Sequence, residues 1–126
     1  MKNPNIVWII ADDITPNAVG CYGQSLPTRA IDALAARGVR FANAWCASAV
    51  CTPSRFNYLT GCFGSRCEHP EFLRTLPPDG PASVEFNVLL EGKLPTLGSV
   101  IRGAGYRTGF AGKWHNSPGA EALGCE

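Results

Sequence analysis

The sequence carries little net charge and no long apolar run. Its 126 residues hold 11 Lys and Arg against 10 Asp and Glu, a formal net charge of +1. It therefore lacks the basic field that attracts nucleic acid or an anionic membrane surface. The longest apolar run, residues 6–11, falls far short of the roughly 20 residues that cross a bilayer. The sequence thus predicts no nucleic-acid partner and no membrane partner, and any anion must be bound by a local site.

Targeting signals and paired metal ligands are also scarce. The apolar run has no charged flank or cleavage region, so no secretory signal is visible. Localisation stays open, and is cytoplasmic if Met1 is the genuine start. The six cysteines contain no CxxC pair, and their disulfide state cannot be read from sequence. Cys62, Cys67 and His69 form the only Cys/His cluster, and without a second pair of ligands they give little support for a zinc site.

The first half of the chain has a strand, a helix and a second strand in its pattern. Residues 6–10 are continuously apolar and β-branched, as in a parallel strand buried on both faces. Thr28 can cap a helix that Gly38 ends, with apolar residues at helical spacing between them. Residues 39–45 then resemble a short strand.

The second half repeats helix and strand around an irregular middle. Thr52 followed by Pro predicts a helix start, with Gly61 as its end. Residues 62–93, rich in Pro and Gly, predict an irregular surface excursion with one short element at 86–90. Thr96 predicts the start of another helix, and residues 106–115 alternate well enough for a strand.

Strands that alternate with helices predict an α/β fold with a largely parallel sheet flanked by helices. The chain has room for one domain or for a piece of one. In such sheets, ligands bind at the carboxyl ends of the strands. Polar residues that follow the predicted strands and helix starts are therefore the candidates for a site.

Asp12 and Asp13 directly follow the first predicted strand. Adjacent strand residues point to opposite faces, so the two carboxylates converge only if the chain leaves strand geometry there. Paired carboxylates also repel each other unless a cation holds them, and hard oxygen ligands favour calcium or magnesium. A solvated turn acid beside a helix cap is the alternative.

Cys51 lies at the predicted start of the helix that ends at Gly61. Unpaired amides and the positive end of the helix dipole favour an anion there, either a thiolate or an oxyanion substrate. The side chain of Arg55, one turn later, tilts back toward the same point. A buried structural cysteine with a surface arginine is the alternative.

Lys113 and His115 are two residues apart in a segment predicted to be extended. Both side chains should therefore face the same side, while Trp114 faces the other. A solvated lysine beside a structurally bonded histidine is the alternative, and His69 fits that description better. Strand ends and a helix start thus supply groups suited to an anion and a divalent cation.

With these motifs in this order, the sequence resembles the sulfatase family, the formylglycine-dependent hydrolases of the alkaline phosphatase superfamily. The resemblance rests on segments that cover nearly the whole chain except residues 62–93. These segments are NIVWIIADD, GCYG, ID-LAARGVRFANAW, CTPSRFNYLTG and GYRTGFAGKWH. CTPSR fits the CxPxR signature at which a maturation enzyme oxidises cysteine to formylglycine.

The resemblance implies a role for each candidate. Asp12 and Asp13 would bind Ca²⁺, and Cys51 would become formylglycine and also contact the metal. Arg55 would orient the hydrated formylglycine, Lys113 would bind a sulfate oxygen, and His115 would hydrogen-bond the hydrate. The substrate would be an aryl or carbohydrate sulfate ester.

The chain also departs from the family pattern. Cys62 stands where LTG is usually followed by Arg, Arg29-Ala30 stand within the usual TPNID, and Asn116 stands where GKWH is usually followed by Leu. No Asp precedes Asn or His, the pair that usually completes the calcium site. The chain therefore looks like the N-terminal part of a sulfatase catalytic domain, incomplete as an alkaline-phosphatase-like fold, and we expect little turnover from it alone. A phosphonate or phosphate monoester hydrolase of the same superfamily and a truncated, non-catalytic chain are the competing interpretations.

Overall fold

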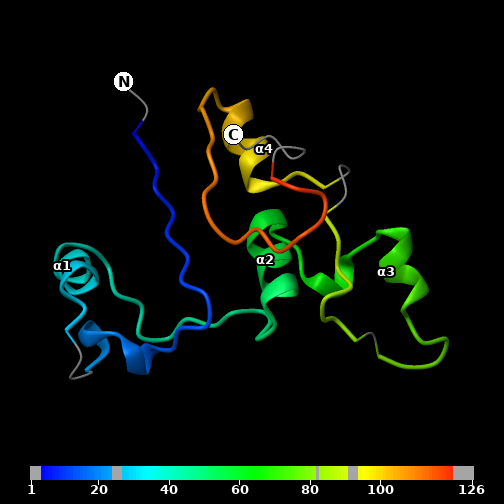
Figure 1. Cartoon of the computed structure of the whole chain (residues 1–126), viewed down its shortest axis with the longest axis horizontal. Coiled ribbons are helices and arrows are strands. Elements are labelled where there is room, and N and C mark those ends of the chain that lie inside the picture. Colours follow the sequence, from blue (N-terminus) through cyan, green and yellow to red (C-terminus); the bar gives the residue numbers. More distant parts are fainter. Residues whose placement is uncertain (1–3, 24–26, 82, 91–93, 121–126) are drawn as a thin grey trace. The chain divides into compact units, whose positions relative to one another are not determined.

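The computed structural model describes residues 4–23, 27–81, 83–90 and 94–120. The chain divides into two compact units, Met1–Ala44 (unit 1) and Trp45–Glu126 (unit 2). Within the described ranges every regular element is a helix, and none is a strand. No helix among these residues is long and apolar enough to span a membrane. Figure 1 labels the four α-helices along the chain.

Unit 1 is built from short helices joined by polar contacts. Its elements are η1 (Pro16–Ala18), η2 (Gly20–Tyr22) and α1 (Arg29–Arg37), and α1 packs against η2. Helix α1 begins after Thr28 and ends before Gly38, as the sequence predicts. The cap differs in detail, because the Thr28 side chain makes no capping bond and instead donates to the Asp32 carboxylate at 2.9 Å.

The three predicted strands are not formed in the residues that the structure describes. Residues 6–10 run without regular structure and are exposed, as are residues 39–45. The segment 106–115 likewise carries no strand. A parallel strand needs partners that are distant in sequence, and helices on both faces to cover it. An apolar run that lacks both stays open, whatever its strand propensity.

Unit 2 holds a hydrophobic core around helix α2 (Cys51–Thr60). Helix α2 packs against η3 (Gly64–Arg66) and against α4 (Leu97–Gly103). Thr96 caps α4 as predicted, in a reciprocal capping box with Ser99, and the helix ends at Gly103, shortly before Gly105 with its φ of 87°. The buried members of the core are Phe56, Cys67, Phe72, Val88 and Leu90.

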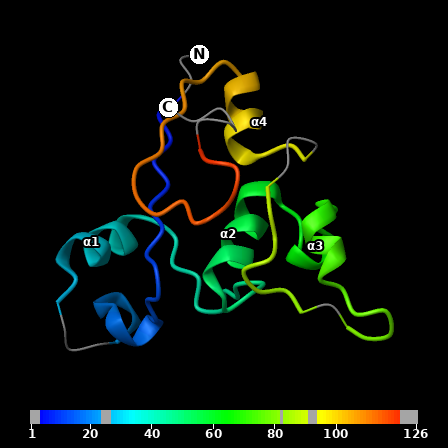
Figure 2. The ribbon, with the colours of Figure 1, turned by 45° about the vertical axis from the view of Figure 1, so that its right-hand side comes forward.

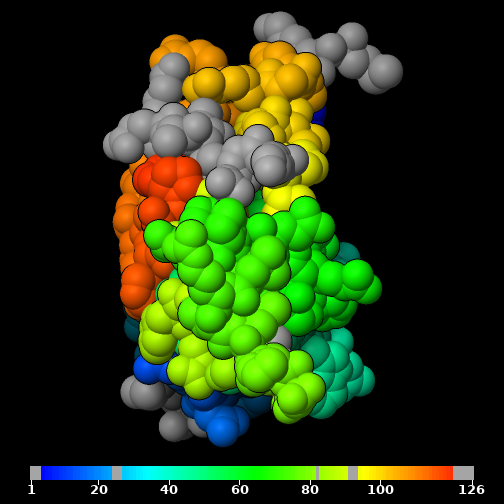
Figure 3. All heavy atoms as spheres, turned by 90° about the vertical axis from the view of Figure 1, so that its right-hand side faces the viewer, coloured from blue at the N-terminus to red at the C-terminus, as the bar shows by residue number. Residues whose placement is uncertain are grey.

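Residues 62–93 contain helical turns and buried core residues, which corrects the prediction of an irregular surface excursion. The segment contains η3 and helix α3 (Pro70–Arg74), and it supplies all the buried core residues just named except Phe56. Figures 1 and 2 both show residues 83–90 passing between α2 and α3. Figure 3 shows residues of α3 and of its neighbours in the sequence at the molecular surface. Within α3, Leu73 is exposed and Phe72 is buried. Two buried apolar side chains spaced two apart, Val88 and Leu90, explain why this segment packs inward despite its Pro and Gly content.

Candidate active site

Cys51 is the first residue of helix α2. The residue before it, Val50, is the N-cap, and its carbonyl accepts the first helical hydrogen bond from Ser54 N at 3.0 Å. The helix thus begins earlier than the predicted cap at Thr52, because Pro53 is tolerated anywhere in the first turn, where its missing N–H has no partner to lose. The half-buried Cys51 thiol is free. The prediction that it lies at the helix start is therefore confirmed, inside the first turn rather than before it.

Arg55 connects α2 to the segment that follows α4. The side chain is buried, and its Nη1 donates to the backbone carbonyl of Lys113 and, at 3.2 Å, to the Tyr58 hydroxyl. Burying a guanidinium is costly unless hydrogen bonds compensate. Arg55 therefore holds the GKWH backbone against α2 across 58 positions of sequence. This contact was not predicted, since no local pattern identifies a distant carbonyl.

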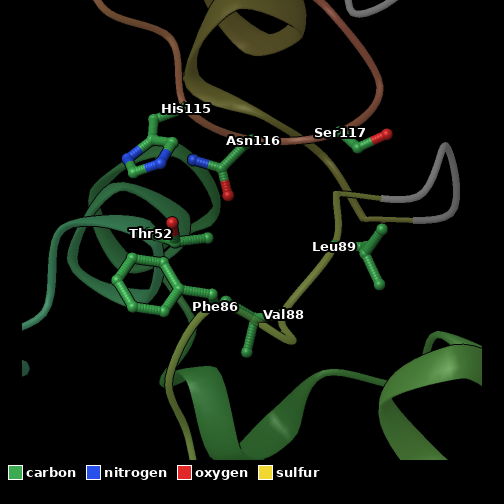
Figure 4. A pocket seen from close by; sticks show the side chains of 7 residues that line it. All are labelled: Thr52, Phe86, Val88, Leu89, His115, Asn116 and Ser117. Atoms are coloured by element: carbon green, nitrogen blue, oxygen red, sulfur yellow. The ribbon is translucent and has the colours of Figure 1, made fainter.

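His115 lines a cavity of about 310 Å³ together with the start of α2. The other lining residues come from α2, from the segment that packs against it and from the residues after His115, as Figure 4 shows: Thr52, Phe86, Val88, Leu89, Asn116 and Ser117. The imidazole ring is exposed and lies 5.8 Å from the Phe86 ring, centroid to centroid. A hydrogen bond of 2.7 Å from Leu90 N to the Ser117 carbonyl ties the two walls together.

Lys113 precedes His115 by two residues but is not among the residues that line the cavity. Its side chain is exposed. Strict alternation does not hold here, because the segment is not a strand and His115 has a φ of 55°. Trp114 faces inward as expected: its ring packs on the core, and its indole N–H donates to the Pro118 carbonyl at 2.8 Å.

Asp13 and His115 share an uncommon backbone geometry. They are the non-glycine residues with positive φ among the described positions, each at 55°. Asp and His tolerate the left-handed region better than most residues, and such conformations cluster at functional sites. At Asp13 the chain leaves extended geometry, the condition under which neighbouring carboxylates can converge. Both outliers thus fall on residues that the sequence singles out for chemistry.

Asp12 and Asp13 are exposed at the end of the apolar segment in unit 1. Their carboxylates are the oxygen ligands that calcium prefers, but a calcium ion takes about six to eight such ligands. No group of three or more metal-binding side chains occurs in the part of the chain that the structure describes. The acidic pair therefore fits calcium in its chemistry and supplies only part of a ligand shell.

Two members of the Cys62, Cys67 and His69 cluster make structural contacts. The Cys67 thiol is buried in the core and donates to the Leu89 carbonyl at 3.5 Å. His69 caps α3, its Nδ1 accepting a hydrogen bond of 3.2 Å from Glu71 N. The structural reading of His69 is thus confirmed.

Thr52, Phe86 and Val88 line the cavity, although the sequence does not predict them there. The sequence predicts Thr52 as a helix cap, whereas it is a buried residue in the first turn of α2. Phe86 and Val88 lie in the segment expected at the surface, and nothing in their local pattern links them to His115. Asn116 was marked only as a departure from the family pattern.

The chain matches the family model described as Sulfatase over residues 4–126. It is 38% identical over 115 residues to an N-acetylgalactosamine-6-O-sulfatase of Bacteroides thetaiotaomicron, covering 90% of this chain and 21% of that protein. It is 38% identical to human arylsulfatase A, covering 95% and 22%, and 37% identical to rat steryl-sulfatase, covering 89% and 19%.

These matches show that the chain belongs to the sulfatase family. The family implies an alkaline-phosphatase-like α/β fold. The chain spans about a fifth of the length of the curated relatives it matches.

Proposed function

We propose that this chain is the nucleophile-bearing segment of a sulfuric ester hydrolase that acts on an aryl or carbohydrate sulfate. One observation carries the proposal: Arg55 ties the helix that begins at Cys51 to the GKWH backbone, so that Thr52 and His115 line one cavity. Two motifs far apart in sequence thus meet beside the predicted nucleophile. The names of the relatives, which are sulfatases of a sugar, of aryl esters and of sterols, support a sulfate ester as the substrate class.

The nucleophile in this proposal is formylglycine, formed from Cys51 by a maturation enzyme that recognises CTPSR. Its hydrated aldehyde would supply two hydroxyls, one to attack sulfur and the other to release the sulfate afterwards. A thiol cannot perform the second step. The first-turn position supports this role, because the unpaired amides of α2 favour negative charge on the nucleophile and on the bound sulfate.

The neighbouring residues then divide the work of binding and proton transfer. His115, exposed in the cavity wall, would hold a proton at a hydroxyl of the nucleophile. Lys113, on a long flexible side chain, would bind a sulfate oxygen. Arg55 would act by positioning, because its Nη1 is engaged with the Lys113 carbonyl.

Mass spectrometry of one tryptic peptide tests the nucleophile. Cleavage after Arg40 and Arg55 releases residues 41–55, which contain both Cys51 and Cys46. When the chain is made together with a maturation enzyme, we expect the aldehyde at Cys51 alone, because only Cys51 precedes x-Pro-x-Arg. Cys46, which is exposed, is the internal control. An alkylatable thiol at Cys51 in every molecule would contradict the proposal.

Calcium is the metal that Asp12, Asp13 and the modified Cys51 would hold. Bound there, it would supply positive charge to stabilise the negative charge of the sulfate group. In a sulfatase chain of the relatives' length that carries this segment, Asp13→Asn should weaken calcium binding about tenfold or more without unfolding the protein. Calorimetry measures the calcium affinity, and Asp79→Asn, at an exposed residue, is the control. Equal affinities would favour a solvated turn.

The sheet belongs to the same proposal. We propose that residues 6–10, 39–45 and 106–115 form strands of a largely parallel sheet in a chain of the relatives' length, which would contain further strands. The alternation of exposed apolar side chains at Val39 and Phe41 supports this. Phe41→Ala should then be costly in the long chain, by about 3–5 kcal/mol, and nearly neutral in the present one. If Phe41→Ala had the same small effect on the free energy of unfolding in both chains, the proposal of a sheet would be overturned.

A further inference from the structure

Two cavity residues beside His115 have no part in the sulfate chemistry described above. Phe86 and Asn116 line the same cavity as the imidazole, one on the segment 83–90 and the other directly after His115 (Figure 4). Ligand cavities combine apolar or aromatic walls with a few polar groups that fix orientation. These two residues are such a combination.

Phe86 is an aromatic side chain that is held open to solvent. It is 62% exposed and tilts by 51° toward the His115 ring. Its backbone is fixed by the next residue, Asn87, whose Oδ1 accepts from Glu85 N at 2.9 Å. The Asn87 Nδ2 donates to Thr75 Oγ1 at 2.8 Å and to the Ser83 carbonyl at 2.9 Å. The turn therefore presents the ring at the cavity in a defined place.

Asn116 has an amide that is poorly satisfied within the chain. Its Nδ2 donates one long hydrogen bond, 3.4 Å, to the Trp114 carbonyl, and its Oδ1 is buried without a partner. Buried polar atoms in folded proteins are nearly always paired, so each exception needs an explanation. Rotation about the Cβ–Cγ bond would turn either end of this amide toward the cavity that the residue lines.

We propose that Phe86 and Asn116 bind the alcohol part of the sulfate ester and select a sugar sulfate over an apolar aryl or steryl sulfate. A sugar ring offers an apolar C–H face to the phenyl ring and hydroxyls to the amide. An alcohol without hydroxyls would use Phe86 but give the buried Asn116 Oδ1 no hydrogen bond, so it would bind less tightly than a sugar. This inference rests on the proposed function, because it takes the cavity beside His115 as the place where the ester binds.

The test is an NMR titration of the 126-residue chain with three probes: galactose 6-sulfate, galactose and phenyl sulfate. We expect Asn116→Leu to weaken galactose 6-sulfate binding about tenfold, the loss of one hydrogen bond, and to change phenyl sulfate binding less than twofold. Asn57→Leu is the matched control, since Asn57 Oδ1 is also buried without a partner but lies outside the cavity wall. Phe86→Ala changes an exposed side chain and should lower the affinity of the chain for both sulfates. This variant keeps the inference testable if Asn116→Leu does not fold.

The outcomes separate this inference from the proposed function. If the unmodified sequence binds both sulfates more tightly than galactose, the cavity is a sulfate-ester site. Equal effects of Asn116→Leu on the two sulfates, or an equal effect of Asn57→Leu, would then overturn the sugar preference alone. The sugar preference would also be overturned if Phe86→Ala left the affinities for both sulfates unchanged. If neither sulfate binds, the assignment of this cavity to the ester falls, and the sugar preference with it.

Discussion

Units 1 and 2 both carry residues that the sequence marks for chemistry, but only unit 2 has a core. Its helix α2 buries Phe56 completely against side chains from three later segments. In unit 1, Val19 is the buried hydrophobic residue among those described, while Val7, Ile9 and the other strand-like residues are exposed. The difference shows that helices which meet their partners within this chain are packed, and that apolar segments which need a sheet are not.

The two units also differ in how their polar contacts span the sequence. In unit 1 the Asp32 carboxylate accepts hydrogen bonds from Cys21 N at 2.7 Å and from both the N–H and the hydroxyl of Thr28, at 3.2 and 2.9 Å. These partners lie within 11 residues of each other. In unit 2, Arg55 reaches a carbonyl 58 residues away. Unit 1 also has hydrogen bonds from Tyr22 to the Phe41 carbonyl and from Arg40 to the Cys21 carbonyl, each between residues 19 apart. Its polar contacts therefore span shorter stretches of sequence than the Arg55 contact of unit 2.

Removing one phenyl ring from each unit gives the largest contrast. Phe56→Ala empties a fully buried position and should lower the free energy of unfolding by about 3–5 kcal/mol, a large fraction of the roughly 5–15 kcal/mol that stabilises a typical domain. Phe41→Ala makes the same change at a side chain that is 67% exposed and should cost less than about 0.5 kcal/mol. Urea unfolding followed by tryptophan fluorescence measures both. Similar costs would mean that the two units do not differ in packing as described.

Adding one methyl group to a glycine in each unit should give smaller effects. A Cβ on Gly64 would lie 2.5 Å from Val84 Cγ1 and 3.4 Å from Val88 Cγ1 inside unit 2. Gly64→Ala should therefore cost about 1–3 kcal/mol through overpacking. Gly103→Ala is the control, because a Cβ there meets nothing within 4 Å and alanine favours the helix by about 0.5–1 kcal/mol. A neutral Gly64→Ala would indicate a looser core.

In unit 1 the corresponding change is Gly20→Ala. Its Cβ would lie 2.6 Å from Asp32 Oδ2, so the carboxylate must move and strain its bonds to Cys21 and Thr28. We expect a local loss of about 1 kcal/mol, at the low end of the cost expected for Gly64→Ala. Hydrogen exchange should show faster exchange at residues 20–32 and no change in unit 2. A loss of protection that spread to α2 would contradict the separate behaviour of the two units.

Helices and their ends were predictable because their signals act within one turn. Thr28 and Gly38 bound α1, and Gly61, with a φ of 72°, ends α2 as expected. The prediction of strands was wrong for the opposite reason: residues 6–10 have strand propensity, but a strand forms only when a sheet is there to receive it, and they form none in the part of the chain that the structure describes. The Pro and Gly content of residues 62–93 predicts a surface segment and gives no sign that its apolar side chains pack inward. Burial depends on the side chains of other segments that pack against a residue, and the local pattern does not contain that information.

The sequence by itself determined where α1, α2 and α4 lie, that Cys51 opens a helix, and that the chain belongs with the sulfatases. Those properties depend on residues a few positions apart. Only the tertiary structure decided that Arg55 binds the Lys113 carbonyl, and that Phe86 lines one cavity with Asn116. These pairs are separated by about thirty to sixty residues, and no spacing rule encodes which side chains meet across so long a loop. Their meeting follows from the packing of the core around Phe56, which is a property of all the segments together.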